Sequence, residues 1–234
     1  MVHGSTTPLH LSSGRYRCYS DAMTTNSVTQ PFVFIGGDPS LDLVNTVAWT
    51  RAGPVHERLT SYEALTRWTE GAGLLDRAAG ASLRRIAQSR VHEARTVLAQ
   101  TRAMRAVLRQ LFSAKAGSKT AAASLAAYNE SLREALQWVE IRLATGRRTR
   151  AGHAFLQWSW QGLEDSLESP LRLIVWSAAE LLISDEAAEI RTCAGEECGW
   201  VYVDRSRNGL RRWCRMQTCG TKSKSRRRRE RSAH

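Results

Sequence analysis

Residues 191–234 read RTCAGEECGWVYVDRSRNGLRRWCRMQTCGTKSKSRRRRERSAH and hold four of the five cysteines of this 234-residue chain. The cysteines form two pairs, Cys193/Cys198 and Cys214/Cys219, with four residues inside each pair and fifteen between the pairs. Zinc takes four ligands in a tetrahedron, and two short loops that each supply two thiolates meet that requirement without closing a long loop. The spacing therefore predicts a small structural zinc module.

Other uses of four cysteines are less consistent with the sequence. The N-terminal residues lack the apolar core of a secretory signal, and reducing compartments favour metal binding over disulfides. Four unpaired structural cysteines would not need such tight clustering. Catalytic zinc keeps an open position and usually has His or carboxylate ligands, whereas the only nearby histidine is His234. We expect one structural Zn²⁺ bound by Cys193, Cys198, Cys214 and Cys219.

The residues between the cysteines predict the local structure of the module. Residues 194–197 are typical of a turn, and the β-branched and aromatic run Trp200–Val203 predicts a short strand. A turn at Asn208-Gly209 would return the chain through residues 211–213, so that a hairpin joins the two cysteine loops. The metal, Trp200 and Trp213 would form most of the core. A basic helix is expected to begin near Cys219.

The charge of the chain is concentrated in this C-terminal segment. Residues 191–234 contain thirteen Lys and Arg against four acidic residues, which is +9 of the total +12. A near-neutral body with a basic arm is typical of proteins that bind polyanions. Cations within the module could be placed to contact base edges, whereas four consecutive arginines on a helix point to every side and suit phosphate contacts. The candidates are Arg205, Arg207, Arg211, Arg212 and Arg215 in the module, and Lys222, Lys224, Arg226, Arg227, Arg228, Arg229 and Arg231 in the tail.

The remaining residues predict a mainly helical domain. Residues 1–31 are rich in Ser, Thr and Gly without periodicity, which predicts a disordered extension containing Cys18; Met23 is an alternative start. Patterns of three or four residues predict helices over 60–75, 81–114, 121–135, 170–183 and, briefly, 186–190. Alternation over 139–143 and 155–160 predicts a β-hairpin with a basic tip at 145–152. We therefore expect an α+β fold with a helical domain over 32–190 and a zinc module over 191–234.

Two groups of polar residues in this domain have competing interpretations. A strand-like run, residues 32–35, ends at Gly36-Gly37, and the apolar stretch that follows contains Asp42, Asn45 and Thr46. The favoured interpretation is that these three cap a helix or satisfy buried backbone groups; the alternative is that they line a small-molecule pocket. Arginines 95, 102, 105 and 109 are similarly interpreted as a solvated helix face, since no aromatic residues alternate with them.

Both ends of the chain resemble a known bacterial family. The run from Cys193 to Arg229 resembles the CGNR zinc finger, in which the four cysteines bind zinc, although this chain has Cys219-Gly220-Thr221-Lys222 at the tetrad that names it. Lys in place of the tetrad's Arg replaces a planar guanidinium, which can donate two parallel hydrogen bonds to one partner, with a single ammonium group. The glycine pair and the string LDLVNT resemble the ABATE domain of stress-induced transcription regulators. The resemblance covers about residues 32–231 and implies a regulator whose N-terminal domain senses a ligand or stress.

Three functions follow as alternatives. The favoured one is a cytoplasmic, zinc-dependent DNA-binding transcription regulator. The others are an RNA-binding or ribosome-associated protein, and a thiol redox switch in which oxidation expels zinc. Neither a Gly-rich phosphate loop nor an HExxH pair is present, so we do not expect an enzyme. Residues 170–183 are too short for a membrane span, and no membrane partner is expected. A homodimer is left open, because many DNA-binding proteins pair to read two half-sites.

Overall fold

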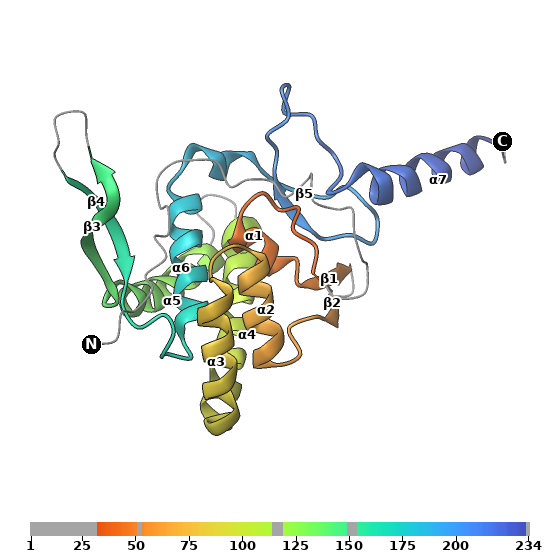
Figure 1. Ribbon diagram of the computed structural model, residues 1–234. Coiled ribbons are helices and arrows are strands. Elements are labelled where there is room, and N and C mark those ends of the chain that lie inside the picture. Colours follow the sequence, from red (N-terminus) through yellow and green to blue (C-terminus); the bar gives the residue numbers. More distant parts are fainter. Residues whose placement is uncertain (1–31, 51–52, 114–118, 149–153, 233–234) are drawn as a thin grey trace.

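The computed structural model describes residues 32–50, 53–113, 119–148 and 154–232. Over these residues it has the predicted α+β architecture, with a mainly helical body, three two-stranded antiparallel sheets and a C-terminal four-cysteine cluster (Figure 1). The body contains helices α1 (Pro39–Val44), α2 (Tyr62–Gly71), α3 (Arg77–Ser89), α4 (Val91–Ser113), α5 (Lys119–Leu136) and α6 (Ser169–Leu182). Its strands are β1 (Val47–Thr50), β2 (Gly53–Glu57), β3 (Val139–Arg148) and β4 (Ala154–Trp160).

The C-terminal part follows a short 3₁₀ helix, η1 (Asp185–Glu189). It contains strands β5 (Ile190–Thr192) and β6 (Val201–Val203), a π-helical turn, η2 (Met216–Gly220), and the final helix α7 (Thr221–Ser232). The expected helix after Cys219 is therefore present. The predicted disordered extension, the alternative start Met23, Cys18 and much of the basic hairpin tip lie outside the described residues.

Helix starts are set by the capping residues in the sequence. The Ser61 hydroxyl accepts a hydrogen bond from the Ala64 N–H at 3.1 Å, and the Asp76 carboxylate accepts one from the Ala79 N–H at 2.8 Å. These bonds satisfy N–H groups that have no partner inside the first turn of a helix. Pro170 lies in the first turn of α6, as predicted.

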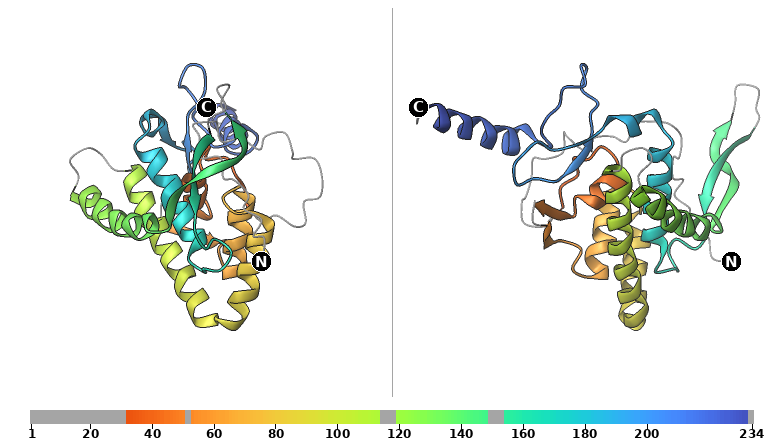
Figure 2. Two further views of the ribbon diagram at one scale, coloured as in Figure 1. Left: turned by 60° about the vertical axis from the view of Figure 1, so that its left-hand side comes forward. Right: turned by 180° about the vertical axis from the view of Figure 1, so that it is seen from behind.

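The single long helix predicted over 81–114 is wrong, because the chain breaks into α3 and α4. Arg90 leaves the helical conformation, with φ −118° and ψ 55°, and α4 starts at the next residue. The chain reverses there, and the two helices meet at one end of the molecule (Figure 2). The reversal lets Leu83 of α3 and Val97 of α4 both reach the core, which one straight helix could not do.

A hairpin that the sequence did not predict corrects the interpretation of the α4 arginines. Strands β1 and β2 pair with each other and bring Glu57 against α4. Arg105 is only 7% exposed; it forms a two-pronged ion pair with Glu57 and donates to the Thr46 hydroxyl at 2.9 Å. Arg102 donates to the Leu59 carbonyl at 2.6 Å. The solvated-face interpretation is therefore wrong for these residues and for Arg109, described below; Arg95 is exposed.

Two other predicted strands have different outcomes. Residues 32–35, predicted as strand-like, form no ladder with a described strand; instead, the N–H groups of Ile35 and Gly36 donate to the Asp42 carboxylate. The β3–β4 hairpin forms as predicted, with Val139 opposite Trp160 and Leu143 opposite Leu156.

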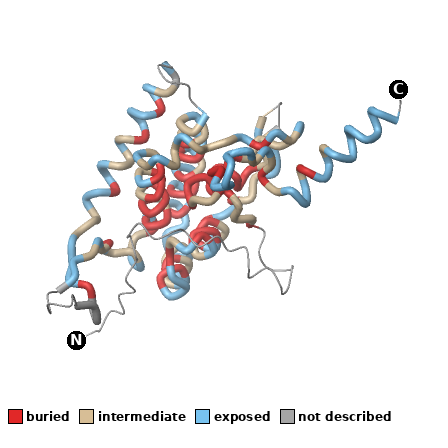
Figure 3. Tube along the Cα trace, turned by 90° about the horizontal axis from the view of Figure 1, so that it is seen from above, coloured by how far each residue is buried: buried red, intermediate tan, exposed pale blue. Residues whose placement is uncertain are grey.

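One apolar core joins the body to the C-terminal segment. Leu65, Trp68, Leu108 and Ile174 lie at its centre, and Val201 and Val203 of β6 belong to the same cluster. Buried residues concentrate in the body, whereas α7 is exposed along its length (Figure 3). Within the described residues, no helix combines the length and apolar character that crossing a membrane would need.

Candidate metal centre and nucleic-acid interface

The four predicted cysteines converge on one point. Their Sγ atoms all lie within 4.8 Å of one another, with 3.7 Å between Cys198 and Cys214 and 3.6 Å between Cys214 and Cys219. Four thiolates at about 2.3 Å from a zinc ion sit roughly 3.8 Å apart at the corners of a tetrahedron. Spacing and donor chemistry both fit one zinc ion, so this cluster can hold Zn²⁺ in a closed site of four thiolates.

The first cysteine pair is positioned by strands β5 and β6. Cys193 directly follows β5, and its N–H donates to the Trp200 carbonyl at 2.8 Å. In the turn between the two cysteines, the Cys198 N–H donates to the Gly195 carbonyl at 3.1 Å. A Cβ at Gly195 would lie 3.0 Å from the Cys198 Cβ and 3.3 Å from the Cys219 Sγ. A side chain there would crowd the metal ligands, which is why the turn contains glycine.

The predicted hairpin inside the module is a different one in the structure. Strand β6 pairs with β5, which precedes the first cysteine, and not with residues 211–213. The loop after β6 is held by Asp204, which accepts hydrogen bonds from the N–H groups of Ser206 and Arg211, both at 2.9 Å. The hydrogen bond that the Ser206 hydroxyl donates to the Asp204 carboxylate is the main cause of the lowered pKa of Asp204. A carboxylate thus replaces the expected strand pairing in this loop.

Tyr202, and not the tryptophan pair, forms the centre of the module. Its side chain is fully buried against Cys193 and Cys214, whereas Trp200 and Trp213 are partly buried around them. The Tyr202 hydroxyl donates to the Arg211 carbonyl at 2.7 Å, and the Arg211 guanidinium lies 4.0 Å from the centre of the ring. The expectation that the two tryptophans form most of this core is corrected. Successive residues of a strand point to opposite faces, so Val201 and Val203 pack in the core of the body while Tyr202 packs against the cysteines.

Helix α1 is tied to the module through Asn45. Its side-chain Nδ2 donates to the Val201 carbonyl at 2.8 Å, and its Oδ1 accepts from the Val201 N–H at 2.9 Å. An amide side chain that bonds both groups of one residue acts like a neighbouring strand. The Val203 N–H adds a bond to the Gly36 carbonyl at 2.8 Å. Strand β6 is therefore held both by β5 and by the body.

Two arginines add charged contacts between body and module. Arg205 forms a bidentate pair with Glu186, both distances being 2.7 Å, and donates to the Gly37 carbonyl at 2.9 Å. The bond from Arg205 is the main cause that lowers the pKa of Glu186. Arg109 of α4 bonds the Gly199 carbonyl and lies 4.4 Å from the Trp49 ring centre. Gly37 has a φ of +86°, a conformation that glycine adopts without strain.

Comparison with known proteins gives two matches to family models. A family described as "Putative stress-induced transcription regulator", ABATE, matches residues 37–185, which is more than half of the chain. The chain belongs to the ABATE family. The CGNR zinc finger matches residues 189–232 of this ABATE protein and includes all four clustered cysteines. No curated protein matches the chain. The resemblance found in the sequence is thus confirmed at both ends.

The three residues of the suspected ABATE ligand pocket lie on and just after α1. The Asp42 Oδ1 atom accepts from the Gly36 and Ile35 N–H groups at 2.7 and 2.9 Å. Thr46 donates to the Leu43 carbonyl at 2.6 Å and accepts from Arg105, while Asn45 binds Val201. The hydrogen bonds of all three side chains go to groups of the protein itself, whereas the buried Asp42 Oδ2 has no partner among the described residues. The bonds explain most of the polar groups in this apolar stretch, and a ligand role stays a prediction.

Replacing Asn45 with alanine is expected to loosen the module from the body. The change leaves the Val201 N–H and carbonyl, both buried, without their partners, which should lower the free energy of unfolding by roughly 2 to 4 kcal/mol. Urea denaturation measures the loss, and hydrogen exchange at the Val201 amide locates it. Asn208→Ala, at an exposed position of the same module, is the matched control. Equal stability of the two variants would contradict this role.

Asp42 is expected to make the stability of the body depend on pH. Burial raises its pKa to about 7, and the charge of Asp38 adds to the rise, while bonds from Gly36 and Ile35 oppose it. The folded state then holds a proton that the unfolded chain releases near pH 4, so stability falls by roughly 1 kcal/mol per pH unit as pH rises towards 7. Denaturation at several pH values should show a shallower slope for Asp42→Asn, and identical slopes would contradict the assignment.

The predicted nucleic-acid residues fall into two groups in the structure. Arg205 and Arg211 are engaged in contacts that hold the fold, and Arg226 pairs with Glu196 and Glu230. The other candidates make no ion pair with any residue that the structure describes: Arg207, Arg212, Arg215, Lys222, Lys224, Arg227, Arg228, Arg229 and Arg231. The contacts thus leave a smaller set of cations available to a partner.

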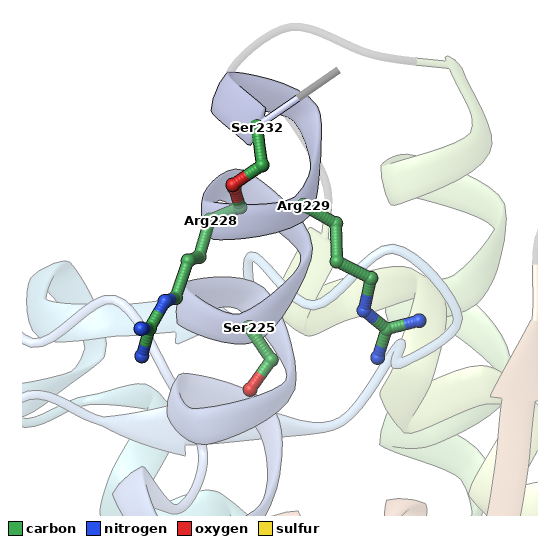
Figure 4. Close-up of a pocket in the computed structure, with 4 residues that line it drawn as sticks. All are labelled: Ser225, Arg228, Arg229 and Ser232. Atoms are coloured by element: carbon green, nitrogen blue, oxygen red, sulfur yellow. The ribbon is translucent and has the colours of Figure 1, made fainter.

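Most of these available cations lie on α7, which extends away from the body (Figure 1). None of its residues is buried. Ser225, Arg228, Arg229 and Ser232 lie along one face of the helix, and the side chains of Arg228 and Arg229 spread to the two sides of that face (Figure 4). Successive residues of a helix point about 100° apart, so the remaining cations of α7 lie on its other faces. A partner could therefore meet positive charge from several directions around this helix.

Proposed function

We propose that this protein is a zinc-dependent transcription regulator that binds DNA through α7 and the exposed cations of the zinc module. The observation that carries the proposal is an exposed helix with cations on all sides that starts two residues after the cysteine ligand Cys219. Membership of a family of transcription regulators and a CGNR zinc finger support it. As part of the same proposal, the protein acts in the cytoplasm and performs no catalysis.

Zinc would act in this proposal by fixing the direction of α7. Cys219 lies within the π-helical turn η2, which continues directly into α7. A Cβ at Gly220 would collide with the Met216 Sδ and lie 3.2 Å from the Trp213 Cδ1, so the helix starts packed against the module. With zinc bound to Cys219, the arginines have a defined position relative to the body; without it, the turn loses its anchor.

The arrangement of cations favours phosphate contacts over base reading on α7. Successive residues on a helix point about 100° apart, so Arg226 to Arg229 cover its circumference. Phosphate contacts position a protein on a duplex without reading its sequence. Any base contacts are assigned to Arg207, Arg212 and Arg215, which are anchored by the module.

The body would reach the module through α1. Asn45, Asp42 and the Gly36-Gly37 turn connect α1 to β6, so a ligand or stress that shifts α1 would also shift the segment that supports the zinc ligands. We assign the sensing role of this regulator to that connection.

Binding of labelled nucleic acids by fluorescence anisotropy tests the proposal. We expect tight, salt-dependent binding of duplex DNA that is lost when a chelator removes zinc and returns when zinc is restored. Stronger competition by duplex RNA would favour the RNA-binding alternative. Binding that is indifferent to zinc removal would contradict the proposal.

The redox alternative has a separate test. Cys193 and Cys214 are buried, whereas Cys198 and Cys219 are half-buried, so an oxidant would reach the latter first. Zinc release at low peroxide concentration would support a redox switch, and retention of zinc would exclude it.

A further inference from the structure

The β3–β4 hairpin has an apolar face that nothing in the described chain covers. Residues opposite each other in an antiparallel pair share a face, as do residues two apart along a strand. Ile141 is paired with Trp158, and Leu143 with Leu156, so all four side chains lie on one face. They are 58%, 42%, 64% and 66% exposed.

This face is fixed in position by its inner end. Val139 and Trp160, the next pair on the same face, pack against the core, and the rings of Trp158 and Trp160 both make T-shaped contacts with the ring of Trp176 on α6. Beyond this base the hairpin stands away from the body (Figures 1 and 2). An isolated two-stranded hairpin is marginally stable in water. An anchored hairpin with an exposed apolar face is typical of a surface that becomes buried against a partner.

The chemistry of this apolar face indicates which class of molecule can bind it. The four side chains carry no charge, so the face does not suit a nucleic acid or another polyanion. Within the hairpin, Glu140 and Arg142 pair with each other on the opposite face. Further charges lie at its two ends: by sequence β3 ends with Arg147 and Arg148, whereas exposed Glu164 and Asp165 follow β4 at the base. These two acids make no ion pair with a described residue. A second hairpin running in the opposite direction would place its basic end over the acidic base of the first.

We propose that the apolar face of the β3–β4 hairpin binds the same face of a second copy of this chain, with the two hairpins antiparallel about a two-fold axis. Such a contact is self-complementary, as an isologous dimer requires. Leu143 and Leu156 of both copies form its centre. The hairpin and α7 lie at opposite ends of the molecule (Figure 1), so dimerisation through the hairpins leaves both basic helices accessible. The proposal does not depend on the nucleic-acid function.

Sedimentation velocity over a range of protein concentrations tests the proposal on the full chain. The wild-type protein should sediment as a dimer, and Leu143→Ser/Leu156→Ser should raise the dissociation constant at least about tenfold. Both positions are exposed, and unchanged circular dichroism and zinc content should confirm that the variant is folded. Ile183→Ser, at an 87% exposed residue that directly follows α6, is the control and should remain dimeric.

A second variant tests the antiparallel orientation. Glu164→Lys/Asp165→Lys leaves the apolar face intact but opposes the basic end of the partner hairpin, so it should also weaken the dimer, most strongly at low salt. A wild-type chain that is monomeric at all concentrations would overturn the proposal. Dimerisation of the leucine variant would also overturn it. So would a result in which only a chain lacking residues 1–31 dimerised, because residues 1–31 would then be the segment that covers the apolar face of the hairpin.

Discussion

Replacing Cys214 with serine is expected to abolish tight zinc binding and to unfold the zinc module. Cys214 is buried at the centre of the cluster, 3.7 Å from the Sγ of Cys198 and 3.6 Å from that of Cys219. Loss of an outer partner of a metal ligand already costs about 10- to 100-fold in affinity, so loss of a ligand should cost more. Cys198→Ser should behave in the same way. Zinc content after dialysis measures the effect.

Unfolding should be confined to the segments that depend on the metal. Hydrogen exchange should rise over 193–199 and 204–220, whereas α1 to α6 remain helical, because their core is apolar. Val201 and Val203 pack in the body, so β6 should lose less protection than the cysteine loops. Cys18→Ser removes the fifth cysteine of the sequence, which is not among the four assigned ligands, and is the matched control. A Cys214→Ser protein that retained one zinc ion per chain would contradict the ligand assignment.

Replacing Arg226 to Arg229 with alanine is expected to weaken DNA binding on the order of 100-fold at moderate salt. The loss should be similar for all DNA sequences, because these side chains surround α7 and are assigned to phosphates. The slope of log affinity against log salt concentration should flatten by about 0.9 for each lost phosphate contact. Anisotropy titrations on several duplexes and at several salt concentrations measure both quantities.

The control removes the same four charges from another part of the molecule. Arg77, Arg85, Arg95 and Arg133 are exposed on α3, α4 and α5, and their replacement by alanine changes the net charge equally. If long-range attraction alone held the DNA, the two variants would lose affinity to the same extent. An unchanged salt slope in the α7 variant would exclude the phosphate role. The paired Arg226 should contribute less than Arg227, Arg228 and Arg229.

Features that depend on neighbouring residues were predictable from the sequence. The two cysteine pairs indicate zinc because ligand type and short spacing restrict the geometry, and the four Sγ atoms do converge. Ser61 and Pro170 mark helix starts, and the alternation over 139–143 predicts the hairpin. The family resemblance rests on equally local motifs. Among the site residues, the string LDLVNT could be recognised in the sequence as unusual, whereas the groups that its polar side chains contact could not be predicted.

Those partners could not be predicted because they come from distant parts of the chain. Asn45 meets Val201 across 156 residues of sequence, and Arg105 meets Glu57 across 48. No periodicity encodes such contacts. Arg205 and Arg211 look like Arg207 and Arg212 in the sequence, yet the former pair is engaged in contacts that hold the fold, whereas the latter pair makes no ion pair with a described residue. The break at Arg90 likewise has no glycine or proline to announce it.

The sequence by itself determined the four cysteines that cluster, the basic C-terminal helix and most of the helical body, because each depends on spacing within a few residues. Only the tertiary structure decided which arginines remain available, that β6 pairs with β5, and that α1 holds the zinc module against the body. These outcomes depend on where separate elements meet in space. That placement is set by the packing of one shared core, to which Val201 and Val203 contribute together with the helices.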